Sequence, residues 1–219
     1  MRSAPKPFLQ LAAERRSTPA FDGTPVPEED LQAILSAGLQ APSSYNLQPW
    51  RFFVVRSAEG RKRLRIACFN QGKVEEAPVV IVACGDADGW RNGDMEEMLR
   101  LGREGGMPES YLEQVRSNVP TYLRDHPNLS AWLNRQVMLA FTTMMWAAES
   151  LGYHTAPMEG FDSARVRSSL KLPLSYEPVA LLVIGHAQGK AKTNGGRFPR
   201  VRTVFEEEYP RPLPSSIPE

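Results

Sequence analysis

The sequence predicts a layered protein of the α+β or α/β class, and three patterns support this prediction. Short continuous apolar runs, which are typical of buried strands, occur at residues 52–55, 79–84 and 179–184. Segments with the apolar spacing of a core-facing helix alternate with these runs, as at 31–39. One longer segment, 129–152, is apolar on nearly every side, so we expect it to be buried or to face a partner chain. Strands and helices in this order pack as layers around one core.

The ends of the expected helices carry recognisable signals. Pro27 suits the first position of a helix, and the acidic residues 28–30 suit the positive end of its dipole. Gly152 is expected to end the long helix, and Asp162 or Ser163 can cap a later one. The remaining expected elements are helices at 8–14 and 61–67 and a further strand at 153–156, followed by a loop at 157–160.

Length, charge and cysteine content narrow the class of protein. The chain has 219 residues, of which 42% are hydrophobic, and a formal net charge of +1. These values predict one domain over residues 1–219 and give no reason to expect nucleic acid as a partner. Two isolated cysteines, Cys68 and Cys84, fit a reducing compartment. No run approaches the roughly 20 apolar residues of a membrane span, so we expect a cytoplasmic protein with no membrane partner.

Two segments depart from the alternating pattern. Residues 85–128 are rich in glycine and charge, and they contain short amphipathic stretches at 94–101 and 108–115. This excursion is either a lid over a site or a surface decoration. Residues 188–219 are basic, then acidic, then rich in proline, and they are too polar to pack on their own core. We expect a C-terminal arm that either frays or lies across another subunit.

The familiar catalytic motifs are missing from the sequence. There is no Gly-x-Gly-x-x-Gly after a strand, no P-loop and no Gly-x-Ser-x-Gly elbow. His126, His154 and His186 are far apart and form no metal-ligand pattern. His154 could line a site, although a lone histidine is more often structural. An enzyme without evident catalytic side chains is what we expect when a cofactor carries out the chemistry.

Two groups of polar residues are candidates for binding such a cofactor. Residues 41–50 present hydroxyls and carboxamides between two prolines, although a helix-stopping loop would have the same composition. Arginines occur near both ends of the chain, at 15–16 and at 200 and 202. Guanidinium groups bind phosphate in bidentate geometry, and Arg200 and Arg202 would point the same way from an extended segment. The alternative for the second pair is a solvated basic tail.

Five blocks of the sequence, taken in order, resemble the FMN-dependent nitroreductase family. They are residues 15–22, 41–50, 69–73, 156–162 and 199–202. The resemblance implies an α+β sandwich in which helices flank a mixed, mostly antiparallel sheet. It also implies an intertwined homodimer, whose tails reach across the partner chain and whose FMN sites lie at the interface.

The resemblance further implies a role for each site residue. The FMN phosphate would be held by Arg15, Ser17, Arg200 and Arg202, and Arg16 would add positive charge at the phosphate end. The pyrimidine edge of the flavin would face Asn70 and Lys73. Backbone N–H groups would reach the flavin N5 from the loop of Pro157, Met158, Glu159 and Gly160. The second subunit would contact the flavin through Pro42, Ser43, Ser44 and Asn46. Pro19 stands where the family often has lysine, which leaves the nucleotide preference open.

The expected activity follows from this resemblance. The protein would be an FMN-dependent oxidoreductase that uses NADH or NADPH to reduce nitroaromatic, quinone or similar acceptors. Hydride would pass through the flavin N5 in a ping-pong cycle, without a catalytic side chain or a metal. Two alternatives stay open: a lid-gated flavoenzyme for one substrate, of reductive-dehalogenase or flavin-processing type, and a flavin-binding module that does not turn over.

Overall fold

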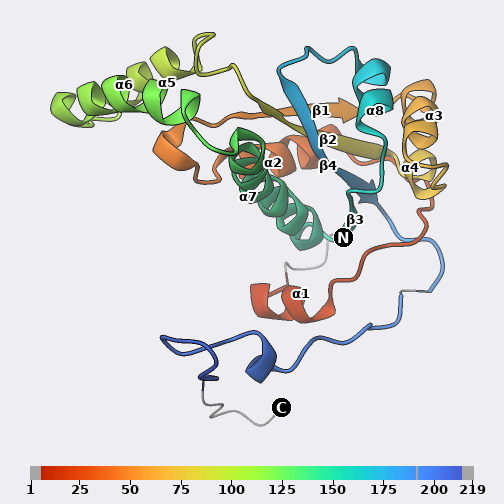
Figure 1. The fold of residues 1–219 in the computed structure, drawn as a ribbon. Helices are drawn as coiled ribbons and strands as arrows, with labels where there is room; N and C mark the ends of the chain where they lie inside the picture. Colours follow the sequence, from red (N-terminus) through yellow and green to blue (C-terminus); the bar gives the residue numbers. More distant parts are fainter. Residues whose placement is uncertain (1–5, 191, 214–219) are drawn as a thin grey trace.

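The computed structural model describes residues 6–190 and 192–213, and it confirms the α+β class. Its four-stranded sheet has the order β1-β2-β4-β3, and every neighbouring pair of these strands is antiparallel (Figure 1). The strands are β1 (Trp50–Val55), β2 (Val79–Asp86), β3 (His154–Met158) and β4 (Tyr176–Gly185). The two central strands therefore come from distant parts of the chain.

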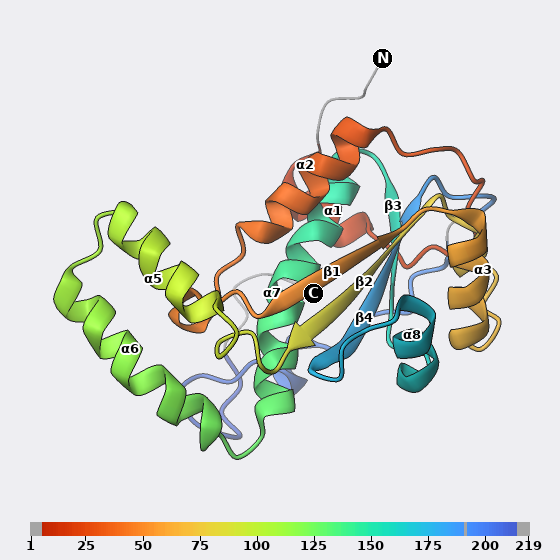
Figure 2. The same ribbon diagram turned by 90° about the horizontal axis from the view of Figure 1, so that it is seen from above.

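Both faces of the sheet are covered by helices (Figure 2). Helices α2 (Glu28–Leu39) and α7 (Leu129–Ser150) pack on one face, and α3 (Ala58–Ala67), α4 (Lys73–Glu76) and α8 (Ser163–Leu170) pack on the other. Alternate residues of β2 enter the two layers: Val79 and Ile81 face α2 and α7, whereas Val80 and Val82 face the opposite layer. Because both faces are buried, the strand reads as a continuous apolar run.

Helix α7 is the longest helix of the described chain, and it packs closely against α2. A Cβ atom added to Gly38 of α2 would lie 2.4 Å from the Cγ of Met144, so the two helices approach over a position without a side chain. Asn128 caps the start of α7, where its Oδ1 accepts the N–H of Ala131 at 2.9 Å. The helix is buried on the side of the sheet, while Leu139 stays 45% exposed on the other side.

The segment between β2 and α7 forms two helices that project from the sheet, α5 (Asp94–Glu104) and α6 (Glu109–Arg124). The expected end of the second helix at residue 115 is wrong, because α6 continues through Pro120. Its buried stripe extends past the proline to Leu123, and this apolar contact outweighs the lost hydrogen bond. At the base of the pair, Arg51 Nη2 lies 2.5 Å from Asp94 Oδ2 and 3.1 Å from Asp86 Oδ2.

Two other expectations about the backbone need correction. Pro157 and Met158 were expected in a loop, but they belong to β3 and pair with Leu182 and Leu181. Proline is tolerated there because β3 lies at the edge of the sheet. The arginines of the arm were expected on an extended segment, but Arg200–Arg202 is a 3-10 turn, so these two side chains diverge.

The chain leaves the sheet after β4 as an arm, and in Figure 1 this arm runs beyond the short helix α1 (Phe8–Glu14). Its apolar side chains Phe198, Val201 and Tyr209 are exposed. Residues 191 and 214–219 of the expected arm lie outside the described residues. Within the described chain, no helix has the length and apolar character that crossing a membrane requires.

Candidate active site

A cavity of about 540 Å³ lies where the C-terminal ends of α1 and α7 meet the start of β3. Five of its lining residues carry a positive charge or can acquire one: Lys6, Arg15, Arg16, His154 and Lys192. Ser17 and Glu149 line the same cavity. The structure thus brings two predicted phosphate-binding residues, Arg15 and Ser17, to one cationic cavity.

Arg15 directly follows α1, and the packing of α1 on α7 positions it. Phe8 contacts Trp146 edge-on with ring centroids 5.3 Å apart, and the guanidinium carbon of Arg15 lies 5.9 Å from the centroid of the same Trp146 ring. The Nη1 atom of Arg15 is buried and has no hydrogen-bond partner. Buried polar atoms are nearly always satisfied, so this donor is available to an acceptor that enters the cavity from outside.

Arg16 has a different local role from Arg15. Its Nη1 donates to the carbonyl oxygens of Ala13 at 2.7 Å and Arg15 at 2.8 Å, so its guanidinium closes the C-terminal end of α1. A cation at this end of a helix is favoured by the helix dipole. Arg16 still lines the cavity, but its nearest acceptors are carbonyl groups of the protein itself.

Glu149 places a carboxyl group among these cations. The hydroxyl of Thr155 donates to Glu149 Oε1 at 2.6 Å, which fixes the carboxyl against β3. Burial raises the pKa of Glu149, while the Thr155 bond and the charge of Arg15 act in the opposite direction. Burial, together with the charges of His186 and Lys6, lowers the pKa of His154. Sequence reasoning missed Glu149, although a lone acidic residue in an apolar helix was a usable signal.

Asn70 and Lys73 lie in a second group with the 157–160 segment. Gln71, which was not singled out from the sequence, donates from Nε2 to the carbonyl oxygen of Gly160 at 3.0 Å and thereby joins the two segments. Asn70 has a left-handed backbone with φ of 58°, which costs about 1–3 kcal/mol and is common at binding sites. Burial and the charge of Lys192 lower the pKa of Lys73, which connects this group electrostatically to the cationic cavity.

Pro42, Ser43 and Ser44 line a different cavity, of about 650 Å³, together with Gln136 and Leu139 of α7. The loop is tied down by two bonds, from the Ser44 N–H to Gln136 Oε1 at 2.8 Å and from the Gln48 N–H to Ser43 Oγ at 2.9 Å. Left-handed backbone recurs through this loop, at Tyr45, Asn46 and Gln48. Gln136 was also missed from the sequence, where it precedes the apolar face of α7.

The two cavities are separated by the length of α7. Gln136 borders one cavity and Glu149 the other, about 20 Å apart along the axis at the usual rise per residue. No residue lines both cavities. Within one chain, the Ser43–Ser44 loop and Arg15 are therefore not brought to one small ligand.

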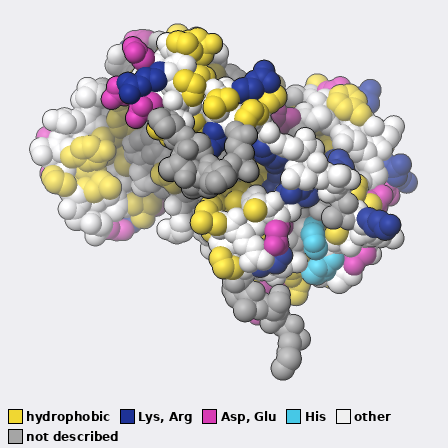
Figure 3. Space-filling model, turned by 90° about the horizontal axis from the view of Figure 1, so that it is seen from below, with side chains coloured by type: hydrophobic (Ala, Val, Ile, Leu, Met, Phe, Trp, Pro, Cys, Tyr) yellow, Lys and Arg dark blue, Asp and Glu magenta, His cyan; other side chains and the backbone are white. Residues whose placement is uncertain are grey.

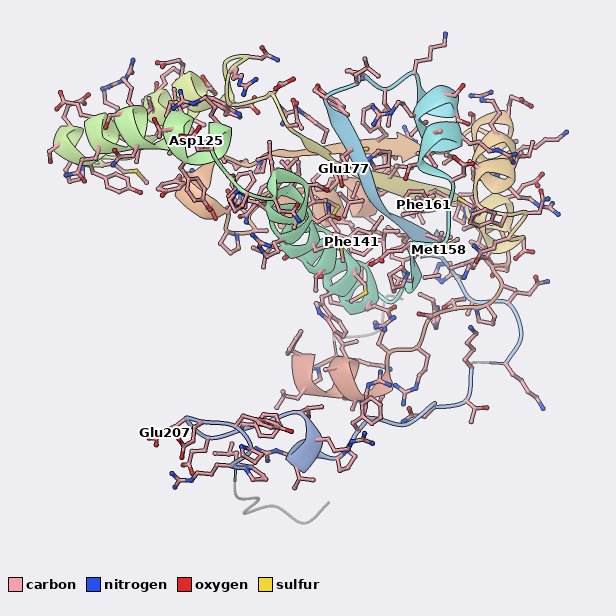
Figure 4. The ribbon with its side chains drawn as sticks, viewed as in Figure 1. Asp125, Phe141, Met158, Phe161, Glu177 and Glu207 are labelled. Atoms are coloured by element: carbon pink, nitrogen blue, oxygen red, sulfur yellow. The ribbon has the colours of Figure 1, made fainter. Side chains whose placement is uncertain are left out.

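Arg200 and Arg202 are not brought to Arg15 either. Neither lines the cationic cavity, and the guanidinium of Arg202 instead lies 4.8 Å from the ring centroid of Phe198. In Figure 4, Glu207 of the arm lies far from Met158 and Phe161. Figure 3 shows the face on which histidine side chains gather, with basic and acidic side chains beside them.

The described residues offer neither a metal-binding cluster nor a reactive cysteine. No group of three or more His, Cys, Asp or Glu side chains in this part of the chain could hold a metal ion. Burial raises the pKa of the Cys68 thiol to about 11 and that of Cys84 to about 12, so neither is a thiolate near neutral pH.

Comparison with known proteins identifies the family of the chain. Residues 12–186 match the model of the Nitroreductase family. A Thermus thermophilus protein named NADH dehydrogenase is 35% identical over 175 residues, which cover 80% of this chain and 84% of that protein. The putative NAD(P)H nitroreductase YdgI of Bacillus subtilis is 32% identical, with 82% of this chain and 88% of that protein covered.

Solved structures show the same fold. The structure of a putative nitroreductase in complex with FMN, from Exiguobacterium sibiricum, has a TM-score of 0.81 and 28% identity, and covers 91% of this chain and 96% of that one. A Staphylococcus epidermidis protein described as a putative NAD(P)H:FMN oxidoreductase has a TM-score of 0.84 at 23% identity, over 93% and 97% of the two chains. These similarities show that the chain has the α+β fold of those solved structures. The chain belongs to the nitroreductase family.

Proposed function

We propose that this protein is an FMN-dependent oxidoreductase that takes hydride from NADH or NADPH and reduces nitroaromatic, quinone or similar acceptors. The observation that carries the proposal is the buried, unpartnered Nη1 of Arg15 in a cationic cavity. A phosphate oxygen is the acceptor that suits this donor, because charge-assisted bonds to phosphate are among the strongest in proteins. The FMN complex of the Exiguobacterium sibiricum relative supports the identity of the ligand.

Each group of residues has a role in this proposal. Arg15 and Ser17 hold the phosphate, with Arg16, Arg200 and Arg202 adding positive charge. The backbone N–H groups of Met158, Glu159 and Gly160, in the segment that begins at Pro157, would hold the isoalloxazine ring. Asn70 and Lys73 would supply a donor and a positive charge for the negative charge that the ring gains on reduction. Bound FMN supplies the chemistry, because its N5 accepts and releases hydride; the protein orients the reactants and excludes water.

The proposal requires a homodimer with FMN at the interface. Pro42, Ser43 and Ser44 cannot reach the Arg15 cavity of their own chain, because the length of α7 separates them, and Asn46 of the same loop lines neither of these two cavities but a third one beside Trp50. The same loop on a partner chain would complete the site. The exposed Leu139 beside this loop, together with the exposed apolar residues of the arm, supports such an interface.

Anaerobic rapid mixing tests the proposal directly. The purified protein is loaded with FMN, desalted and mixed with NADH or NADPH while the flavin absorbance is followed. Bleaching by at least one nucleotide, and return of the colour on adding a nitroaromatic or a quinone, are the expected results. A protein that retains FMN but is reduced by neither nucleotide is a binding module, and a colourless protein contradicts the cofactor assignment.

A lid-gated enzyme for one substrate is the second candidate, and one contact favours it. The ring of Tyr45, in the Ser43–Asn46 loop, lies edge-on to Tyr122 of α6 with centroids 5.9 Å apart. Helix α6 therefore contacts the proposed flavin-binding loop, as a lid over the site would. A panel of acceptors decides: reduction of many nitroaromatics and quinones supports the broad reductase, and reduction of one class supports the gated enzyme.

A further inference from the structure

The cationic cavity contains one feature that a simple phosphate site does not need, the carboxyl group of Glu149. It lines the same cavity as Arg15 and Ser17, and Thr155 holds it in place through the 2.6 Å bond to Oε1. Glu149 also occupies the last turn of α7, where the helix dipole disfavours a negative charge. An ionised carboxylate at this position would repel a phosphate dianion in a partly buried site.

We propose that Glu149 is a further binding residue of this cavity, and that it takes up a proton when a phosphate group binds beside Arg15. The inference rests on the proposed FMN function. The proton comes from solvent and no covalent bond to the ligand forms or breaks. In its neutral form the carboxyl changes from an acceptor-only group into a hydrogen-bond donor, which a phosphate oxygen can accept. Glu149 thereby makes the affinity for a phosphate ester depend on pH.

The surrounding charges explain why the proton moves on binding. Besides Glu149, the charged and titratable groups that line the cavity are Lys6, Glu14, Arg15, Arg16, Tyr153, His154 and Lys192. His186 and Asp22 act on His154 from behind it. In the ligand-free protein the charges of Arg15 and Lys6 favour the ionised form of Glu149, against its burial. A bound phosphate neutralises these cations and adds negative charge, so both changes raise the pKa of Glu149.

Isothermal titration calorimetry measures this proton directly. FMN is titrated into the cofactor-free protein in buffers of different ionisation enthalpy, at several pH values from about 5.5 to 8, a range that spans the second pKa of a phosphate ester. The slope of binding enthalpy against buffer enthalpy gives the number of protons taken up. Wild-type protein is expected to take up more protons than E149Q, since the comparison cancels the titration of the phosphate and of His154.

Affinity provides the second readout. As pH rises, E149Q should bind FMN increasingly more tightly than wild type. The ratio approaches about tenfold for each unit by which the phosphate raises the pKa of Glu149. Riboflavin, which has no phosphate, should show neither the proton uptake nor the difference. E14Q is the matched control, because Glu14 lines the same cavity but is bonded to Lys6 and has a lowered pKa. E14Q should take up as many protons as wild type.

Three outcomes distinguish the ideas. FMN that binds with equal proton uptake to wild type and E149Q overturns the role of Glu149 and leaves the proposed function intact. FMN that does not bind to wild type at all overturns the proposed function. If E149Q fails to fold, FMN and riboflavin are instead compared on the wild-type protein and on H154Q. If neither of these two proteins takes up more protons with FMN than with riboflavin, the inference is overturned.

Discussion

The hydroxyl of Tyr153 donates to Oδ2 of Asp30 across 2.6 Å, and both side chains are at least 95% buried. This bond joins the first turn of α2 to the residue that precedes β3, so it connects two layers of the fold. The charged acceptor makes it worth about 1.5–3 kcal/mol.

Tyr153→Phe is therefore expected to lower the free energy of unfolding by about 1.5–3 kcal/mol, because it deprives a buried carboxylate of a donor. Urea unfolding followed by circular dichroism measures the change. Tyr111→Phe is the control, since Tyr111 lies on α6 and is 44% exposed. Equal stability of the two variants would contradict the role assigned to the Tyr153 bond.

The free energy of unfolding of the cofactor-free protein should depend on pH in a way that reveals the protonation of Glu149. Burial raises the pKa of Glu149 above its ordinary value of 4.5. The folded state therefore binds this proton more tightly than the unfolded state does. The resulting stabilisation is complete below the ordinary value and is lost as pH rises through the folded-state pKa.

E149Q has no carboxyl group that loses a proton at this position. Its free energy of unfolding relative to wild type should therefore increase from pH 4 to pH 8. Urea unfolding at a series of pH values, at constant ionic strength, gives the difference. Glu14→Gln is again the comparison, because the pKa of Glu14 is lowered through its bond with Lys6 and should give the opposite slope. A difference between E149Q and wild type that does not vary with pH would show that Glu149 is not held in a perturbed state.

Arg15→Ala should weaken FMN binding by about 1.5–3 kcal/mol, or roughly 10- to 100-fold, because it removes a charge-assisted donor to the phosphate. Riboflavin affinity should hardly change, since riboflavin lacks the phosphate. Fluorescence titration with the two flavins separates these effects. Arg16→Ala is the informative neighbour: its guanidinium caps α1, so a smaller loss of FMN affinity is expected. Equal losses of FMN affinity in R15A and R16A would contradict the assignment of the phosphate to Arg15.

A mixing experiment tests whether two chains form each FMN site. R15A has an intact loop, and the double variant S43A/N46A has an intact Arg15, so each alone should bind FMN poorly. In a mixed dimer, one of the two sites joins the intact parts of both chains. Mixing with reversible denaturation should restore about a quarter of the wild-type FMN sites at equal concentrations. Absence of any recovery, while mixed dimers form, would show that the loop and Arg15 serve separate sites.

The sequence predicts much of the fold because some patterns have only one solution. Val79 to Cys84 can be a strand buried on both faces and little else, and it became the central strand β2. Pro120 misled the reading of α6, because a proline looks like a helix end unless one sees that Leu112, Val115 and Leu123 share a buried face. Pro157 misled the reading of β3 for a related reason, since its tolerance depends on the edge position of the strand.

The site was predictable in its residue types but less so in its geometry. Arg15 and Arg16 are adjacent and chemically identical, and only the tertiary structure shows that one faces the cavity without a partner while the other closes a helix. Gln136 follows two other polar residues of α7, and Glu149 is the single acidic residue of that helix; their partners, Ser44 and Thr155, are distant or separated by a turn. Hydrogen bonds of this kind are determined by tertiary packing, and no local pattern in the sequence predicts them.

Because a single uninterrupted helix borders both cavities, their relative orientation is set by the helical repeat. One residue inserted between Leu139 and Trp146 would rotate the far end by about 100° and advance it by about 1.5 Å. The contacts of Tyr153 with Asp30 and of Arg15 with Trp146 at one end could then no longer be made together with the contact of Gln136 with Ser44 at the other. Insertions and deletions should therefore be far less tolerated in α7 than in the turn between α5 and α6, where added residues displace nothing but solvent.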